Sequence, residues 1–170
     1  GVTSALVFMR TKHRTDRIAK ALHAEGFKAQ AIHGGRSQRQ RDQAINGFRE
    51  GRYKILVATD VAARGLDVRG ISHVVNYDVP NSPDDYIHRI GRTGRANARG
   101  VAFTFVCPEE GPALYAIERE LGNRIPRAEW EGAVPLAPAP RPRNGNGNGR
   151  SFRRGPNSGR NFSRRPARRR

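Results

Sequence analysis

The sequence has almost no cysteine: Cys107 is the only one in 170 residues. A single thiol excludes an internal disulfide and a zinc site built from several cysteines, and it fits a reducing compartment, so we expect a cytoplasmic protein. Long apolar runs are also missing, since the longest are the length of a strand, and no signal peptide is recognisable. We therefore expect no membrane partner. The first residues, Gly1-Val2-Thr3-Ser4, lack an initiator Met, which indicates a piece of a longer protein.

Acidic residues are absent after Glu131, whereas eleven arginines follow it. Residues 1–131 hold the other 21 of the 32 basic residues and all 15 acidic ones, a net charge of +6, so most of the formal +17 belongs to the C-terminal stretch. That stretch is rich in Pro, Gly, Asn and Arg and has too little apolar surface to offset the entropy of ordering. The sequence thus predicts a folded domain at 1–131 and a disordered basic tail at 132–170. We expect the tail to bind nucleic acid nonspecifically; a merely solubilising tail is the alternative.

Within the first 131 residues, short apolar runs alternate with helical patterns. This alternation predicts an α/β fold, a parallel sheet with right-handed crossovers and helices on both faces. Ser37 with Gln40 is a capping box, and Ser82 before Pro83 is a second helix start. Either Thr11 or Thr15 caps the first helix. The strands are expected at 5–9, 27–32, 53–58, 72–76 and 101–106, and the helices near 12–25, 38–48, 61–64, 83–90 and 112–121.

Ligands of such sheets bind outside the carboxyl ends of the strands. We therefore expect the functional loops at 10–13, 33–37, 59–67 and 91–99. Cys107, at the end of the last strand, is expected to be a core thiol. His13, His23 and His73 have no second ligand at a metal-binding spacing, so we expect no metal site. Trp130 is expected to pack against the core.

The densest cluster of cations is the stretch 86–95, Tyr-Ile-His-Arg-Ile-Gly-Arg-Thr-Gly-Arg. Glycines between arginines indicate a chain that leaves a helix and turns, so that Arg92 and Arg95 project to one side. Guanidinium groups held in this way suit a phosphate that gains charge during transfer. A basic loop that only touches solvent or RNA is the alternative.

Two further segments combine glycine with polar side chains at the ends of expected strands. In 58–68, Thr59, Asp60, Arg64 and Asp67 are more polar than a crossover loop requires, although a capped loop with an Arg64–Asp67 ion pair is the alternative. Segment 33–41 sets a Gly-Gly pair before a helix, a natural phosphate site. A tight turn and a solvated basic face would explain that segment nearly as well.

Taken together, these segments resemble the second RecA-like domain, the C-terminal domain, of DEAD-box ATP-dependent RNA helicases. Residues 88–95 are similar to that family's motif VI and residues 63–67 to motif V. Leu6-Val7-Phe8 with Thr11-Lys12 is similar to motif IV, and Gln38 with Arg41 to the Gln-x-x-Arg element. The resemblance covers roughly residues 4–121, and with Ile125-Pro126 and the basic tail it is most similar to the bacterial RhlE-like branch.

The resemblance implies a role for each matched residue. Arg92 and Arg95 would be arginine fingers for the γ-phosphate of ATP, and Gly65 and Asp67 would lie at the nucleotide, Asp67 at its ribose. Thr11, Gly35, Gln38, Arg41 and Thr59 would contact the RNA backbone. Arg64, His88 and Arg89 would couple the sites across the domain interface.

Two motifs of that family are missing: the Gly-x-x-x-x-Gly-Lys-Ser/Thr loop and the Asp-Glu-Ala-Asp box. They belong to the N-terminal RecA-like domain, which would bind most of the ATP and its Mg²⁺ and would be the partner of this chain. We expect this chain alone to neither hydrolyse ATP nor unwind RNA duplexes or remodel ribonucleoprotein. The alternative function is an ATP-independent RNA-binding or annealing module made of the RecA-like domain and its tail.

Overall fold

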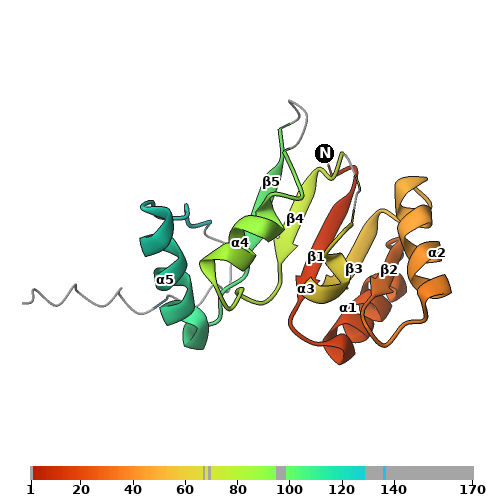
Figure 1. Cartoon of the computed structure of the whole chain (residues 1–170), viewed down its shortest axis with the longest axis horizontal. Coiled ribbons are helices and arrows are strands. Elements are labelled where there is room, and N and C mark those ends of the chain that lie inside the picture. The colour runs from red at the N-terminus through yellow and green to blue at the C-terminus, as the bar shows by residue number, and fades with distance from the viewer. Residues whose placement is uncertain (1, 67, 69, 95–98, 129–135, 137–170) are drawn as a thin grey trace, which may run out of the picture. The chain divides into compact units, whose positions relative to one another are not determined.

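The computed structural model describes residues 2–66, 68, 70–94, 99–128 and 136 (Figure 1). Five parallel strands form one sheet in the order β2-β3-β1-β4-β5. The expected α/β architecture with a parallel sheet is therefore confirmed. The strands are β1 (Ala5–Met9), β2 (Ala29–Ile32), β3 (Ile55–Thr59), β4 (His73–Asn76) and β5 (Val101–Thr104). The helices are α1 (Lys12–Ala24), α2 (Gln38–Arg49), α3 (Asp60–Ala63), α4 (Pro83–Ile90), the 3-10 turn η1 (Pro108–Glu110) and α5 (Gly111–Leu121).

Alternate side chains of the central strands enter two separate apolar clusters, because successive residues of a strand point to opposite faces. One cluster joins the sheet to α2 and α3, and its members include Leu6, Phe8, Leu56, Ala44 and Ala62. The other joins the sheet to α1, and its members include Val7, Met9, Val57, Ala19 and Ala31. Both faces of the central strands are thus covered, which explains why β1 is apolar at all five positions.

The helix starts follow the capping chemistry of the sequence. Ser37 and Gln40 form the reciprocal capping box of α2, and the Ser82 hydroxyl accepts from the Asp85 N–H at the start of α4. Of the two possible caps of α1, Thr11 is the one used, since its hydroxyl accepts from the Arg14 N–H. Thr15 is fully buried inside the helix instead, and its hydroxyl donates to the Thr11 carbonyl.

Strand β5 is shorter and more exposed than the sequence suggests. It ends at Thr104, and the side chains of Phe103 and Phe105 are about half exposed, at 47% and 52%. Phe103 stacks on His73, whereas Phe105 meets the edge of Tyr77, so both rings lie on the sheet face that carries α1. Cys107 follows on this exposed edge and is itself exposed, so the expectation of a core thiol is wrong.

A third apolar cluster lies beside the sheet and joins α4 to α5 through Val79, Tyr86 and Ile117. Within the described part of the chain, no helix is both long and apolar enough to cross a bilayer. Trp130 and, apart from Leu136, the expected tail at 132–170 lie outside the described residues. The boundary between residues 131 and 132 stays a prediction.

Candidate functional site

The carboxyl ends of β1, β2 and β3 bring together the residues singled out for a nucleic-acid backbone. Thr59 is the last residue of β3 and pairs with Met9, the last residue of β1. Thr11 follows Met9 two positions later. The side chain of Lys12 passes 3.8 Å from the point where a Cβ on Gly35 would lie, so the loops after β1 and β2 are neighbours. Three separate segments therefore meet at one edge of the sheet, as expected for a parallel sheet.

The first turn of α2 adds two side chains to this edge. The Arg41 guanidinium donates to Oε1 of Gln38 at 3.3 Å, and the Gln38 amide donates to Asp42 at 2.8 Å. All three side chains lie on one face of the helix, because residues three and four apart are neighbours. Gln38 and Arg41 thus present an amide and a guanidinium in fixed relation, close to the positive end of the helix dipole.

His33, at the end of β2, organises the loop that precedes α2. It is buried, and its Nδ1 accepts the Gly35 N–H at 3.1 Å while its carbonyl accepts the Arg36 N–H at 3.0 Å. Its Nε2 lies 3.0 Å from Oδ1 of Asp16 on α1, and the Arg36 guanidinium donates to the same oxygen at 2.6 Å. Sequence reasoning missed Asp16 and gave His33 no role, since their contact depends on the packing of α1 against β2.

The carboxylate of Asp16 is held in its charged form by these partners. Partial burial raises its pKa, but the contacts with His33 and Arg36 and the charge of Arg36 lower it by more, so the pKa lies below the ordinary value of 3.8. The ionised carboxylate is therefore a strong acceptor for the Arg36 guanidinium and lies in close contact with the imidazole of His33.

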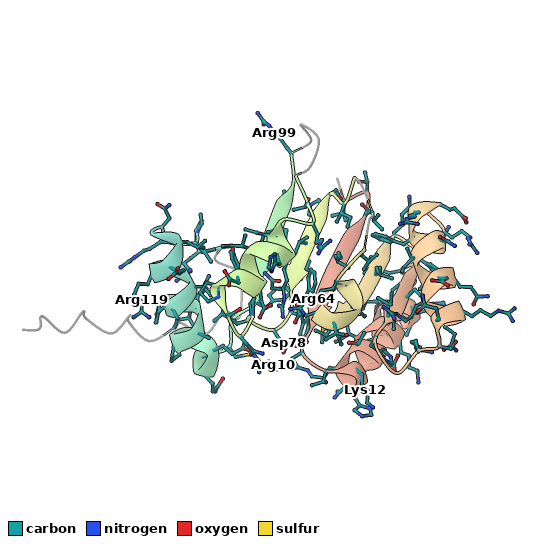
Figure 2. All side chains as sticks on the ribbon, in the orientation of Figure 1. Arg10, Lys12, Arg64, Asp78, Arg99 and Arg119 are labelled. Carbon is teal, nitrogen blue, oxygen red and sulfur yellow. The ribbon has the colours of Figure 1, made fainter. Side chains whose placement is uncertain are left out.

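A second group of singled-out residues surrounds a hollow of about 250 Å³ between α3 and α4. The wall includes Phe8 and Asp60 from the sheet side, Arg64 after α3, and His88 and Arg92 from α4 and its end. Arg64 is largely exposed, at 75%, and lies 4.0 Å from Asp85. Figure 2 shows Arg64 at the end of α3, near the middle of the view.

Arg89 forms the floor of this region and is almost completely buried, at 4% exposed. Its Nε and Nη2 donate to the two carboxylate oxygens of Asp60, at 2.6 and 2.8 Å. Its Nη1 donates to Oδ1 of Asn76 and to the carbonyl of Asp78, at 3.3 and 2.9 Å. The guanidinium also stacks over the ring of Phe8, 5.1 Å from its centroid. A bidentate pair of this kind fixes α4 to the end of β3.

Arg92 begins the turn after α4, and its guanidinium donates to the Leu66 carbonyl at 3.2 Å. The neighbouring Gly65 has φ +75°, a left-handed conformation that favours glycine, with open space around its α-carbon. Thr93 is bonded to the segment before β4: its hydroxyl donates to the Ile71 carbonyl at 2.5 Å, and the two residues form a β-bridge. Asp67 and Arg95, the other expected nucleotide ligands, lie outside the described residues.

The expectation that loop 91–99 lies at the carboxyl ends of the strands is wrong. Its described residues, 91–94 and 99, lie between the end of α4 and the start of β5, and the bridge between Thr93 and Ile71 puts Thr93 beside the segment before β4. A loop that enters a parallel strand must lie at the amino end of that strand. Arg92 therefore reaches the hollow along the face of the sheet, beside α3 and α4.

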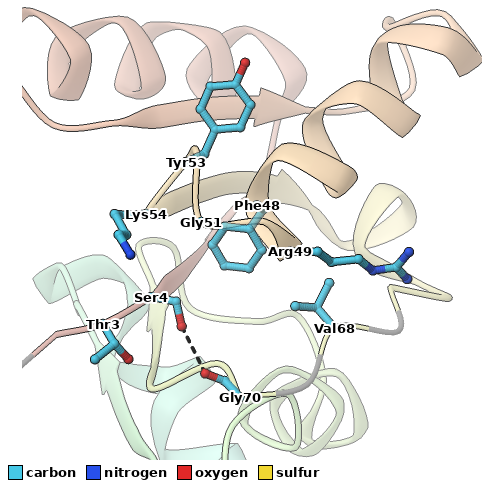
Figure 3. Close-up of a pocket in the computed structure, with 9 residues that line it drawn as sticks. All are labelled: Thr3, Ser4, Phe48, Arg49, Gly51, Tyr53, Lys54, Val68 and Gly70. Atoms are coloured by element: carbon cyan, nitrogen blue, oxygen red, sulfur yellow. Dashed lines mark hydrogen bonds between the residues drawn. The ribbon is translucent and has the colours of Figure 1, made fainter.

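A larger cavity of about 600 Å³ lies at the opposite edge of the sheet (Figure 3). Its lining comes from the segments that precede β1, β3 and β4, where Ser4 donates to the Gly70 carbonyl at 3.1 Å. Lys54 and Arg49 contribute its cations. Among the residues that the structure describes, none of those singled out from the sequence lines this cavity, so the larger hollow and the described part of the candidate site are different places.

The sheet order and the Arg89–Asp60 pair define an α/β domain with Lys12 and Arg41 at the carboxyl ends of its strands and Arg64 and Arg92 at the hollow, a charge pattern that suits a polyanionic or phosphorylated ligand. Comparison with known families narrows this class. The family model described as "Helicase conserved C-terminal domain" matches residues 2–97. The chain therefore belongs to the family of helicase conserved C-terminal domains.

Individual relatives agree with this assignment. The chain is 53% identical over 123 residues to the DEAD-box ATP-dependent RNA helicase CshA of Geobacillus kaustophilus, with 72% of this chain and 26% of the relative covered. It is 51% identical to CshA of Bacillus subtilis, with 72% and 25% covered. The chain thus spans about a quarter of the length of these curated relatives.

Solved structures show the same fold. The E. coli DEAD-box protein SrmB, solved bound to the regulator of ribonuclease activity A, gives a TM-score of 0.74 at 38% identity, with 82% of both chains covered. A DEAD-box protein from Methanococcus jannaschii gives a TM-score of 0.68 at 44% identity, with 72% of this chain and 36% of that chain covered. The expected DEAD-box C-terminal, RecA-like domain is confirmed, while the RhlE-like branch stays a prediction.

Proposed function

We propose that this chain is the C-terminal half of an ATP-dependent RNA helicase that couples ATP hydrolysis to local RNA unwinding or ribonucleoprotein remodelling. The observation that carries the proposal is the hollow between α3 and α4, which Arg92 lines together with the almost completely buried Arg89 and its ion-pair partner Asp60. The DEAD-box relatives, named as ATP-dependent RNA helicases, support it.

In this proposal Arg92 and Arg95 are arginine fingers that stabilise the charge developing on the γ-phosphate of ATP. Gly65 lets the backbone turn beneath the nucleotide, and Asp67 accepts from the ribose hydroxyls. The N-terminal RecA-like domain of the same protein supplies the phosphate-binding loop and holds Mg²⁺. A guanidinium supplied across an interface acts only when the two domains close, which links hydrolysis to closure.

The RNA backbone is proposed to lie along the edge formed by Thr11, Gly35, Gln38, Arg41 and Thr59. Amide, hydroxyl and guanidinium donors there suit sugar and phosphate oxygens, which carry no sequence information. Binding at such an edge would be sequence-independent and weakened by salt.

The two sites are proposed to communicate through Arg64, His88 and Arg89. Arg64 and His88 line the exposed wall of the hollow, where an approaching domain could touch them. Arg89 would act from inside the domain. Its bidentate bond to Asp60, next to Thr59, joins the helix that carries His88 to the end of β3. We propose a cytoplasmic protein, as the reducing compartment expected from the single cysteine implies.

The test is the RNA-stimulated ATPase of the whole protein of which this chain would be the C-terminal part. We expect Arg92→Ala to lower kcat by about a thousandfold, the lower range for loss of an arginine finger. The matched control Arg99→Ala, outside the hollow, should stay within about twofold of the wild type. The 170-residue chain alone should be inactive.

Three outcomes would contradict the proposal. The isolated chain could show RNA-stimulated ATPase that Arg92→Ala abolishes, or the whole protein could keep its activity with Arg92→Ala. Thirdly, a whole protein that anneals complementary RNA strands without any ATPase would favour the ATP-independent module instead.

A further inference from the structure

We infer that His33 and Asp16 form a positioning pair for the proposed RNA edge, with the imidazole acting as a neutral Nε2–H tautomer. The inference rests on the proposed RNA site and deepens it, since it concerns how Thr11 and the loop 34–36 are held in one arrangement. His33 and Asp16 would touch no RNA themselves; they act through the backbone that they hold.

The ring of His33 replaces the side chain of an Asx turn. Its Nδ1 accepts the N–H of the residue two positions later, Gly35, at 3.1 Å, as an Asn or Asp oxygen does when it stabilises a turn. The bond requires Nδ1 to be without a proton, because both nitrogens of a protonated imidazole are donors. The proton of the neutral ring is therefore on Nε2, the nitrogen that lies 3.0 Å from Asp16.

This arrangement also decides which atoms of the loop can meet a phosphate. The Gly35 N–H is directed to the imidazole, and the Arg36 N–H is directed to the His33 carbonyl. Neither amide is presented to RNA in this conformation. The loop instead sets the direction in which α2 begins, and so the places of Gln38 and Arg41.

Asp16 ties this turn to α1. Its carboxylate contacts both His33, 6% exposed, and the Arg36 guanidinium, while Lys12 from the first turn of the same helix passes close to Gly35. The charged groups that face the imidazole are thus Asp16 from α1 and Arg36 from the loop. Because Thr11 caps α1, the pair joins the two segments proposed to follow the RNA backbone into one unit.

Two substitutions at position 33 separate the contribution of the Gly35 turn from that of the contact with Asp16 on α1. In His33→Asn, the Asn oxygen can accept the Gly35 N–H, so the turn is kept, whereas the contact with Asp16 is lost. In His33→Leu both are lost, and the Gly35 N–H has no acceptor within the turn. The matched control is His23→Leu, the same substitution at an exposed histidine on α1.

The measurement is a titration of the 170-residue chain with a short single-stranded RNA, followed by NMR at the backbone amides of Thr11, Gly35 and Gln38. Reading the affinity at these amides separates the edge from the arginines of 137–170. We expect about tenfold weaker binding at the edge in His33→Leu, which loses the turn and the Asp16 contact, and about threefold weaker binding in His33→Asn, which loses the Asp16 contact alone. His23→Leu should bind as the wild type does, and wild-type affinity in His33→Asn would overturn the role of Asp16.

A second readout needs no substitution. The ¹⁵N shifts of the His33 ring at about pH 7.5 should show an unprotonated Nδ1 and a protonated Nε2. A ring protonated at Nδ1 would overturn the inference even if RNA binds.

The remaining outcomes separate this inference from the proposed function. Equal affinities at the edge for wild type and His33→Leu would overturn the positioning role alone. Equal losses in His33→Asn and His33→Leu would also overturn it, because the turn would then not be what matters. Edge amides that do not respond to RNA in the wild type would overturn the proposed RNA site and this inference with it.

Discussion

The ion pair between the buried Arg89 and the partly exposed Asp60 offers the sharpest test of how the domain is held together. Asp60→Asn keeps the shape of the side chain but removes its charge and replaces one acceptor oxygen with an NH₂ donor. Two oxygens of Asp60 accept from Nε and Nη2 of Arg89, so the new NH₂ must face an N–H of the guanidinium. The charge of Arg89 would remain, 4% exposed, beside neutral partners.

The size of the effect follows from the burial of the two partners. Breaking a buried ion pair from one side costs about 3–5 kcal/mol. Asp60 is 35% exposed, so water screens part of the interaction, and Arg89 keeps its bonds to Asn76 and the Asp78 carbonyl. We therefore expect a loss of about 2–3 kcal/mol in the free energy of unfolding.

Equilibrium urea unfolding of the 170-residue chain, followed by circular dichroism, measures this loss. With a slope of about 2 kcal/mol per molar urea, the midpoint should fall by about 1–1.5 M. The matched control is Glu50→Gln, which removes the charge from an ion pair with Arg52 in which both side chains are 60% exposed. That change should cost less than about 0.5 kcal/mol. Equal midpoints for the two variants would refute the view that burial makes the Arg89–Asp60 pair important.

Two further predictions concern the ends of helices. Ser37→Ala removes the reciprocal capping box of α2 and should lower the free energy of unfolding by about 1 kcal/mol in the same urea assay; an unchanged midpoint would show that the box is not needed. Glu118 on α5 accepts from the Arg127 guanidinium at 2.8 Å and from the Ile125 N–H at 2.9 Å. Burial raises the pKa of Glu118, but these bonds and the nearby Arg127 and Arg124 charges lower it below its ordinary 4.5, so its contribution is present above that pH and is lost as pH falls further. Glu118→Gln should therefore make unfolding less dependent on pH below about 4.5, and identical acid unfolding curves would contradict this.

The sequence was sufficient to predict those features that depend on residues within a single helix or strand. The wholly apolar run at 5–9 is β1, because a strand covered on both faces has no polar side. The caps at Ser37 and Ser82 also start their helices as expected, since capping depends on residues three apart. The residues expected to follow the RNA backbone meet at one edge because the strand ends of a parallel sheet coincide.

Contacts between distant segments could not be read from the sequence. Arg89 stands among exposed cations in the sequence, yet it is buried, because a carboxylate 29 residues earlier lies under α4. The tie between His33 and Asp16 depends in the same way on the packing of α1 beside β2. The exposure of Cys107 and the place of loop 91–99 both follow from the position of β5 at the edge of the sheet, which local patterns do not reveal.

The hydrogen bond and β-bridge between Thr93 and Ile71 set the backbone next to Arg92 before any reaction at Arg92 begins. The residue that follows Arg92 is held by a hydroxyl bond and a β-bridge, and Gly100 packs so closely against Thr93 that a side chain there would overlap it. The backbone next to Arg92 is therefore set when the domain folds. Fixing a residue costs about 1–2 kcal/mol of backbone entropy. That entropy is spent once, during folding, rather than in each turnover, so the guanidinium would meet a nucleotide with only its side-chain torsions left to settle.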